Sequence, residues 1–260
     1  MRLCYAAYFD ASGKAEGFQF MTVAGAVAPI KKWIRFKRDW SDVLRSEGVS
    51  EFHATDFACS QGEYRAWKND KIRRSKFLKQ LIQIIKENTN KLFTVTAEID
   101  KWKSVNSEYL LEETFHSPYA LLGLSVVCQA LNWAKGKKVR SRSQIRLFFE
   151  DGDEGWSGLQ QLCKKFNNFE PVRLPRGDAV PFQVGDLISW KSRIAATNAL
   201  LELGAGNLQG IYDELASLDS VLVRPGHRSI YSYEYLVKTC ETFKVPKRPL
   251  LEPQIKSEEK

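Results

Sequence analysis

The stretch CYAAYFDASGK, residues 4–14, begins as an apolar strand and stops at Asp10, directly before a run of turn residues. A second apolar stretch, FQFMTVAGAVA, follows at residues 18–28. The short connection between them contains Gly13 and Gly17, and such a connection is typical of a hairpin. Two strands joined this closely run antiparallel. The chain is therefore expected to open with a β-hairpin, which we place at the edge of a larger sheet.

Strand-like and helix-like patterns alternate along the rest of the chain. Further strands are expected at 51–57, 91–100, 144–149 and 170–175, and helices at 31–48, 72–88, 108–134, 157–167 and from near Val184 to 203, with one or two more within 210–245. Alternation of this kind is typical of an α/β fold. With an antiparallel opening pair, the sequence predicts a mixed sheet flanked by helices. We expect one domain over residues 1–245 and a loose, charged tail over 246–260.

The composition is that of an ordinary globular protein. The 260 residues are 43% hydrophobic and 27% charged, and the five cysteines form no C-x-x-C pair. The start of the chain is not a signal peptide, and the longest apolar run, residues 119–134, is slightly short for a membrane span and contains Gln129 and Asn132. We therefore expect a cytoplasmic protein with no membrane partner.

The chain is basic, with a formal net charge of +8. A basic balance favours a polyanionic partner such as nucleic acid, although lysines and arginines also simply solvate helix surfaces. The densest basic cluster lies at residues 135–146. Neither G-x-G-x-x-G nor G-x-x-x-x-G-K-[ST] follows a predicted strand, which argues against dinucleotide and P-loop nucleotide binding.

Carboxylates follow predicted strands or open a predicted helix at three places. Asp10 ends the first strand, Glu150 and Asp151 end the strand at 144–149, and Asp186 lies at the start of the helix near Val184. Clustered carboxylates repel one another unless a cation or a proton lies between them. Hard oxygen ligands suit Mg²⁺, with water and phosphate completing its coordination. The pattern predicts a Mg²⁺ or Mn²⁺ site that acts on phosphodiesters.

Each of these carboxylates also has a purely structural interpretation. Asp10 could form a hairpin turn, Asp153 could cap the next helix on a solvated acidic turn, and Asp186 could be a first-turn acid that complements the helix dipole. Strand alternation puts Glu150 and Asp151 on opposite faces, and the sequence leaves open which one faces the site.

Four polar residues are candidates for a supporting role. His53 is a candidate general base or substrate contact, and its alternative is a hydrogen-bonded residue outside the chemistry. The candidates for substrate binding are Ser12, Gln183 and Lys191. Gln183 alternatively orients Asp186 or is a polar residue at a helix start, and Lys191 is alternatively a solvated lysine.

Four short motifs resemble a bacterial family, the uncharacterised domain of unknown function 3800. The motifs are YFDASG (8–13), FHATDF (52–57), FEDGD (149–153) and PFQVGDLI (181–188). The family motifs that they resemble are Y-x-D-E-S-G, a segment around H-A-T-D, a strand that ends in acidic residues, and Q-x-A-D-L. The order of the motifs agrees, and the resemblance covers roughly residues 3–195.

The resemblance implies an RNase H-like fold with helical additions and a metal-dependent nuclease site. Carried over by position, it implies metal-holding roles for Asp10, for Glu150 or Asp151, and for Asp186. Ala11 stands where the family usually has glutamate, and Gly185 stands where it usually has alanine.

We therefore expect a Mg²⁺- or Mn²⁺-dependent phosphodiesterase that acts on DNA or RNA. The alternative is a non-catalytic RNase H-like module with a degraded site, which binds nucleic acid or a protein. A nucleotidyl- or phosphotransferase that uses the same metals is a further alternative.

Overall fold

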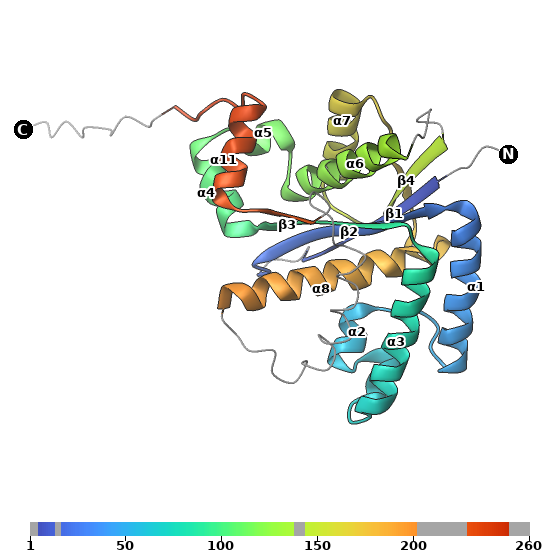
Figure 1. Ribbon diagram of the computed structural model, residues 1–260. Coiled ribbons are helices and arrows are strands. Elements are labelled where there is room, and N and C mark those ends of the chain that lie inside the picture. Colours follow the sequence, from blue (N-terminus) through green and yellow to red (C-terminus); the bar gives the residue numbers. More distant parts are fainter. Residues whose placement is uncertain (1–4, 14–16, 138–143, 202–227, 250–260) are drawn as a thin grey trace, which may run out of the picture.

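The computed structural model describes residues 5–13, 17–137, 144–201 and 228–249 (Figure 1). A single six-stranded sheet has the order β5-β4-β1-β2-β3-β6. Its strands are β1 (Tyr5–Ser12), β2 (Phe20–Pro29), β3 (Lys91–Glu98), β4 (Ile145–Glu150), β5 (Val172–Leu174) and β6 (Arg228–Tyr231). The helices are α1 (Ile30–Ser46), α2 (Ala54–Cys59), η1 (Gly62–Trp67), α3 (Lys71–Asn88), α4 (Ile99–Glu108), α5 (Leu111–Phe115), α6 (Pro118–Gly136), α7 (Trp156–Asn167), η3 (Arg176–Asp178), α8 (Phe182–Leu201) and α11 (Tyr233–Thr242).

The opening hairpin is antiparallel as predicted, but it lies in the middle of the sheet and not at its edge. β1 pairs with β2 and β2 with β3 in antiparallel fashion, whereas β4 pairs in parallel with β1, β5 with β4 and β6 with β3. Helical crossovers bring these parallel strands to the outer sides of the hairpin and of β3. The predicted class, a mixed sheet flanked by helices, is confirmed.

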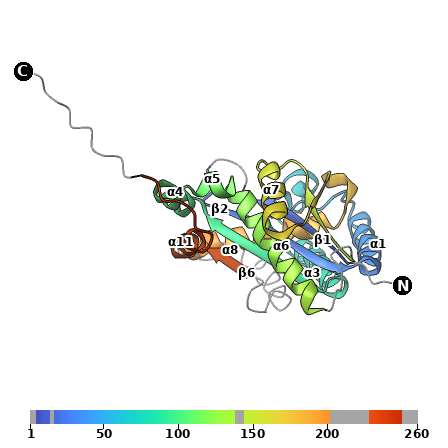
Figure 2. The ribbon, with the colours of Figure 1, turned by 90° about the horizontal axis from the view of Figure 1, so that it is seen from above.

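Helices cover both faces of the sheet (Figures 1 and 2). Ala7 and Phe9 of β1 pack toward α6, α7, α4, α5 and α11, whereas Ala6 on the same strand packs toward α8, α1, α2 and α3. Successive side chains of a strand point to opposite faces, and helices on both faces explain why β1 and β2 are apolar almost throughout. Two hydrophobic cores result, one on each side of the sheet.

The predicted strand at 51–57 is wrong, because residues 54–59 form helix α2. The apolar spacing there comes from Phe52 and Phe57, which both join an aromatic cluster with Tyr64 and Phe77. Side-chain packing, and not strand pairing, therefore explains the pattern in this segment.

The predicted helix at 108–134 is wrong in its first part. Helix α6 begins only at Pro118, where Ser117 Oγ accepts a hydrogen bond from the backbone N–H of Ala120. Proline at the first helical position, after a serine N-cap, is a strong start signal. The other predicted strands and the helices at 31–48, 72–88 and 157–167 are confirmed to within a few residues.

The C-terminal part of the described chain packs on α4 and α5. The backbone oxygen of Pro246 accepts from Leu110, and Arg248 Nε donates to the backbone oxygen of Asn106 at 2.7 Å. Most of the predicted loose tail lies outside the described residues, and the division of the chain at residue 245 stays a prediction. Within the part of the chain that the structure describes, no helix is long and apolar enough to cross a membrane.

Candidate metal and nuclease site

Three carboxylates lie close together near the C-terminal ends of β1 and β4: those of Asp10, Glu150 and Asp186. β1 and β4 run in parallel with Phe9 opposite Phe149, so the next residues, Asp10 and Glu150, lie side by side. Asp186 lies in the second turn of α8, which packs on β1. The three residues are only 4%, 6% and 6% exposed. Buried carboxylates need a compensating charge, a proton or hydrogen bonds.

Gly185 allows α8 to approach β1 at this point. A Cβ on Gly185 would lie 2.9 Å from the backbone nitrogen of Asp10 and 3.0 Å from its Cβ and from the backbone oxygen of Ala24. These distances are shorter than ordinary van der Waals contact, so a side chain would push the helix away from the strand. The glycine at the position where the related motif has alanine therefore brings Asp186 close to Asp10.

Arg176 provides the positive charge between two of these carboxylates. Its guanidinium lies 3.4 Å from Glu150 Oε1 and 3.2 Å from Asp186 Oδ2, and its Nε donates to Glu51 Oε1 at 2.5 Å. Burial by itself lowers the pKa of Arg176, but the hydrogen bond to Glu51 and the charges of Asp186 and Glu150 raise it overall. The arginine stays protonated and links three acidic side chains from three separate segments.

The environment of Asp186 disfavours its charged form. Burial raises the pKa of Asp186, and the neighbouring charge of Asp10 raises it further. The backbone N–H of Ala54, which donates to Asp186 Oδ2 at 2.9 Å, and the charge of Arg176 act in the opposite direction. Two like charges close together in a buried place favour a nearby positive charge or a proton on one of them.

The structure distinguishes Glu150 from Asp151. Glu150 is buried and contacts Arg176, whereas Asp151 is 39% exposed on its side chain and pairs with Arg173 at 2.6 Å. Strand alternation explains the separation, and the register of β4 beside β1 decides which residue joins Asp10. Only Glu150 lies with Asp10 and Asp186.

His53 and Asp56 form a half-exposed pair beside this cluster. His53 Nδ1 lies 3.0 Å from Asp56 Oδ2, and both side chains are 40% exposed. They line an open cavity of about 340 Å³ together with Ser50, Glu51, Gly62, Glu63, Tyr64 and Arg176. Since Arg176 also contacts Glu150 and Asp186, the histidine and the carboxylates flank the same cation.

Gln183 connects the start of α8 to the basic helix α1 and to the segment before α2. Its Oε1 accepts from Trp40 Nε1 at 2.7 Å and from the backbone N–H of Phe52 at 3.0 Å. The carbonyl of the amide is therefore engaged within the protein, one helical turn before Asp186. This geometry fits the orienting role among those considered for Gln183.

The other two residues predicted to contact substrate lie in or near the same region. Ser12 Oγ accepts from Arg193 Nε at 2.9 Å. Lys191 is 6% exposed, so it is not the solvated lysine of the alternative interpretation. Their roles toward a substrate stay predictions.

Two charged residues near the site, the part-buried Arg176 and the buried Asp153, were missed or misjudged from the sequence. Arg176 lies in the three-residue turn η3, where no periodic pattern marks it. Asp153 was expected on a solvated turn, but it is buried and faces Tyr119, whose pKa is raised by burial and by the charges of Asp153 and Asp10. Helix α7 begins without a side-chain cap, at Gly155. Ala11, where the related motif has glutamate, belongs to the apolar core on the α6 face.

The three carboxylates are suitable ligands for a divalent cation, but Arg176 already contacts two of them, Glu150 and Asp186. Buried carboxylate oxygens from Asp10, Glu150 and Asp186 are the ligands that Mg²⁺ and Mn²⁺ prefer. Among the residues described, however, no three His, Cys, Asp or Glu side chains are arranged to hold a metal ion as they stand. Binding a metal between Glu150 and Asp186 therefore requires Arg176 to move.

No protein-family model and no curated protein matches the chain. Solved structures similar to it in fold include ribonuclease HII in a complex with PCNA from Archaeoglobus fulgidus, at 12% identity and a TM-score of 0.42, over 85% of this chain and 92% of that one. Bst ribonuclease HIII in complex with Mn²⁺ is similar at 14% identity and a TM-score of 0.45, over 90% of this chain and 64% of that one.

Ribonuclease H2 from Pyrococcus horikoshii is similar at 14% identity and a TM-score of 0.43, over 92% of this chain and 99% of that one. The likeness is one of overall fold, whereas the arrangement of Asp10, Glu150 and Asp186 is read from this chain itself.

Proposed function

We propose that this chain is a divalent-metal-dependent nuclease that hydrolyses phosphodiester bonds in nucleic acid. The observation that carries the proposal is the convergence of buried Asp10, Glu150 and Asp186 from β1, β4 and α8. Three carboxylates in one buried place are costly for a fold unless a cation is bound there. The sequence motifs that resemble domain of unknown function 3800 support the same proposal. We also propose that the chain belongs to that family.

Each side chain has a defined part in this proposal. Asp10, Glu150 and Asp186 hold Mg²⁺ or Mn²⁺, which supplies an activated water and charge stabilisation for the phosphodiester when bound. The backbone N–H of Ala54 holds Asp186 in position. His53, oriented by Asp56 and half-exposed in the adjacent cavity, accepts or returns a proton.

A non-catalytic nucleic-acid-binding module is the second candidate, and two observations favour it. Ala11 removes a carboxylate that the related motif has, and Arg176 already provides a positive charge between Glu150 and Asp186. In that case the carboxylates hold Arg176 and the fold in place, and binding does not depend on a metal.

Calorimetric titration with Mn²⁺ separates the two candidates. The wild type is compared with Asp10→Asn, Glu150→Gln and Asp186→Asn, and the same samples are incubated with labelled single- and double-stranded DNA and RNA. Asp151→Asn is the matched control, because Asp151 adjoins Glu150 in sequence but pairs with Arg173 outside the cluster.

The nuclease proposal predicts Mn²⁺ binding and Mn²⁺-dependent cleavage by the wild type and by Asp151→Asn. Both properties should be lost in the three variants of the cluster. A wild type that binds no Mn²⁺ refutes the catalytic proposal and favours the binding module.

A further inference from the structure

Two adjacent helices, α1 and α3, carry a large excess of positive charge. α1 carries six basic and two acidic side chains, and α3 carries six basic and one acidic side chain, so their net charge is +9. The net charge of all 260 residues is +8. The charges of the rest of the chain nearly cancel in sum, although the basic cluster at residues 135–146 also lies there.

The helices on the opposite face of the sheet show no such excess. α4, α5, α6, α7 and α11 together carry six basic and six acidic side chains. Charged side chains that only solvate a helix surface can be of either sign, so solvation alone does not explain an excess of basic residues. The imbalance on α1 and α3 is thus specific to that face, and like charges gathered there repel one another unless an anionic partner is present.

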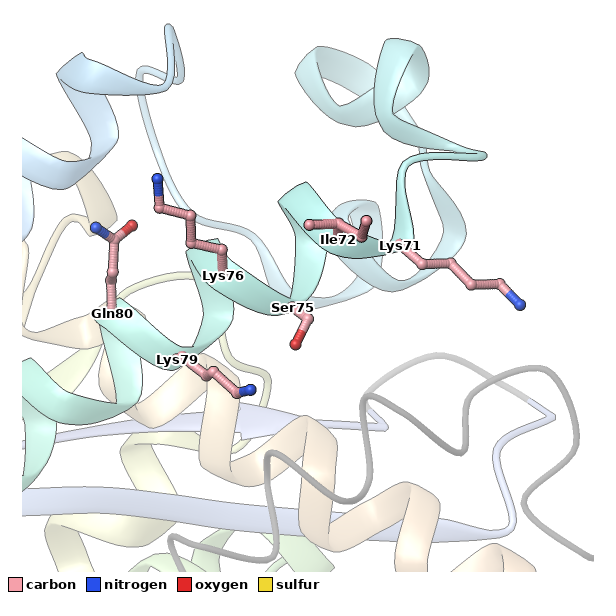
Figure 3. A pocket seen from close by; sticks show the side chains of 6 residues that line it. All are labelled: Lys71, Ile72, Ser75, Lys76, Lys79 and Gln80. Carbon is pink, nitrogen blue, oxygen red and sulfur yellow. The ribbon is translucent and has the colours of Figure 1, made fainter.

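Several of the basic residues of α1 and α3 point outward, whereas Arg73 and Arg74 are part-buried and bind groups within the protein. α1 buries Trp33, Phe36, Trp40 and Leu44 on its inner side. Lys31 and Lys37 on α1 and Lys71 and Lys76 on α3 are exposed and make no salt bridge to any described residue. Lys71, Lys76 and Lys79 line an open pocket of about 550 Å³. Figure 3 shows these three side chains extending from α3 in different directions.

This basic surface is continuous with the candidate site. Trp40 of α1 is hydrogen-bonded to Gln183 at the start of α8, and Arg45, Ser50 and Gln183 line one cavity of about 300 Å³. Ser50 also lines the cavity that contains His53. A chain of phosphates on α1 and α3 would therefore lie next to the cavity beside the carboxylates.

We propose that the surface formed by α1 and α3 binds the phosphate backbone of nucleic acid without reading its sequence. This inference deepens the proposed function, because it assigns the substrate-binding face of the same site. α1 is about 25 Å long, which matches about seven base pairs of duplex. Flexible lysines act as point charges on phosphates and do not supply the planar, bidentate contacts that base recognition favours.

The test compares two variants with the same change in charge. In the first, Lys31, Lys37, Lys71 and Lys76 are replaced by glutamate. In the control, the exposed lysines of the opposite face, Lys101, Lys103, Lys164 and Lys165, are replaced by glutamate. Binding of a labelled 20-base-pair DNA is measured by fluorescence anisotropy at several salt concentrations, without divalent metal. Circular dichroism confirms that each variant is folded.

The first variant should bind more than about 100-fold more weakly at low salt, and its slope of log affinity against log salt should be smaller by about 3 to 4. The control should retain most of the wild-type affinity. Equal losses in both variants, or no loss in either, would overturn the inference. So would a wild type that binds vesicles of anionic lipid but not DNA.

The same data separate this inference from the nuclease proposal. A wild type that binds through α1 and α3 but never cleaves refutes the nuclease and leaves the binding surface standing. A wild type that cleaves, and whose binding is unaffected by the four substitutions on α1 and α3, overturns the binding surface alone.

Discussion

Replacing Arg176 by methionine tests whether its guanidinium neutralises the buried carboxylates. Methionine keeps most of the aliphatic length but removes the charge and every donor to Glu51, Glu150 and Asp186. Removing one partner of a buried ion pair costs about 3–5 kcal/mol. The Arg176 side chain is 32% exposed, so water reaches part of the site. We therefore expect a loss of about 2–3 kcal/mol at neutral pH.

The loss should depend on pH with a defined sign. Burial and Asp10 already raise the pKa of Asp186, and without Arg176 that pKa rises further. A carboxyl whose pKa is raised in the folded protein destabilises the fold once it ionises. The deficit of Arg176→Met relative to the wild type should therefore be small below about pH 3, where Asp186 is protonated in both the folded and the unfolded chain. It should grow as the pH rises through the folded pKa.

Thermal unfolding with and without Mn²⁺ measures both effects. The expected loss corresponds to a decrease in Tm of about 4–12 °C for a chain of this size. If the metal takes the place of the guanidinium, Mn²⁺ should stabilise the variant more than the wild type. At a concentration 100-fold above the variant's Kd, the stabilisation of the variant itself is about 2.7 kcal/mol. Arg173→Met is the control, since Arg173 and Asp151 form a pair in which both side chains are about 40% exposed.

Two results would refute this reasoning. An Arg176→Met protein as stable as the wild type at neutral pH would mean that the guanidinium does not compensate the carboxylates. Equal stabilisation of both proteins by Mn²⁺ would mean that Arg176 does not compete with the metal.

Three further substitutions test the geometry around α8. Gly185→Ala should lower the free energy of unfolding in urea by about 1–3 kcal/mol and weaken Mn²⁺ binding, because the new Cβ would meet the main chain of β1. Gly136→Ala is the control and should not lower the stability, because there is open space around its Cβ. Gln183→Leu should cost about 2–4 kcal/mol in urea unfolding, because the donors of Trp40 and Phe52 lose their buried acceptor. Asp186→Asn should remove the part of the stability that falls with rising pH, which unfolding at several pH values measures.

The sequence alone predicted the strand and the helix that carry Asp10 and Asp186. The apolar run before Asp10 indicated a strand that stops at this carboxylate, and the pattern from near Val184 indicated a helix that contains Asp186. The strand, β1, continues beyond Asp10 to Ser12. The structure confirms both elements. The resemblance to one family placed these residues in a common site, and the structure brings them together.

Some choices could not be made from the sequence because they depend on contacts between distant segments. Alternation along β4 separates Glu150 from Asp151, but only its pairing with β1 decides which of them lies with Asp10. The β1–β2 hairpin lies in the middle of the sheet because later segments of the chain add β4 beside β1 and β3 beside β2. The strand expected at 51–57 failed because Phe52 is held by aromatic side chains from other segments and not by a neighbouring strand.

What the sequence determined by itself is most of the strands and long helices and the carboxylates near their ends, because periodicity and turn chemistry act over a few neighbouring residues. Only the tertiary structure decided that Arg176, from a short turn with no pattern, lies between Glu150 and Asp186. It also decided that the positive charge of α1 and α3 gathers on one face. Electrostatic interactions act through space, so their partners are set by packing and not by distance along the chain.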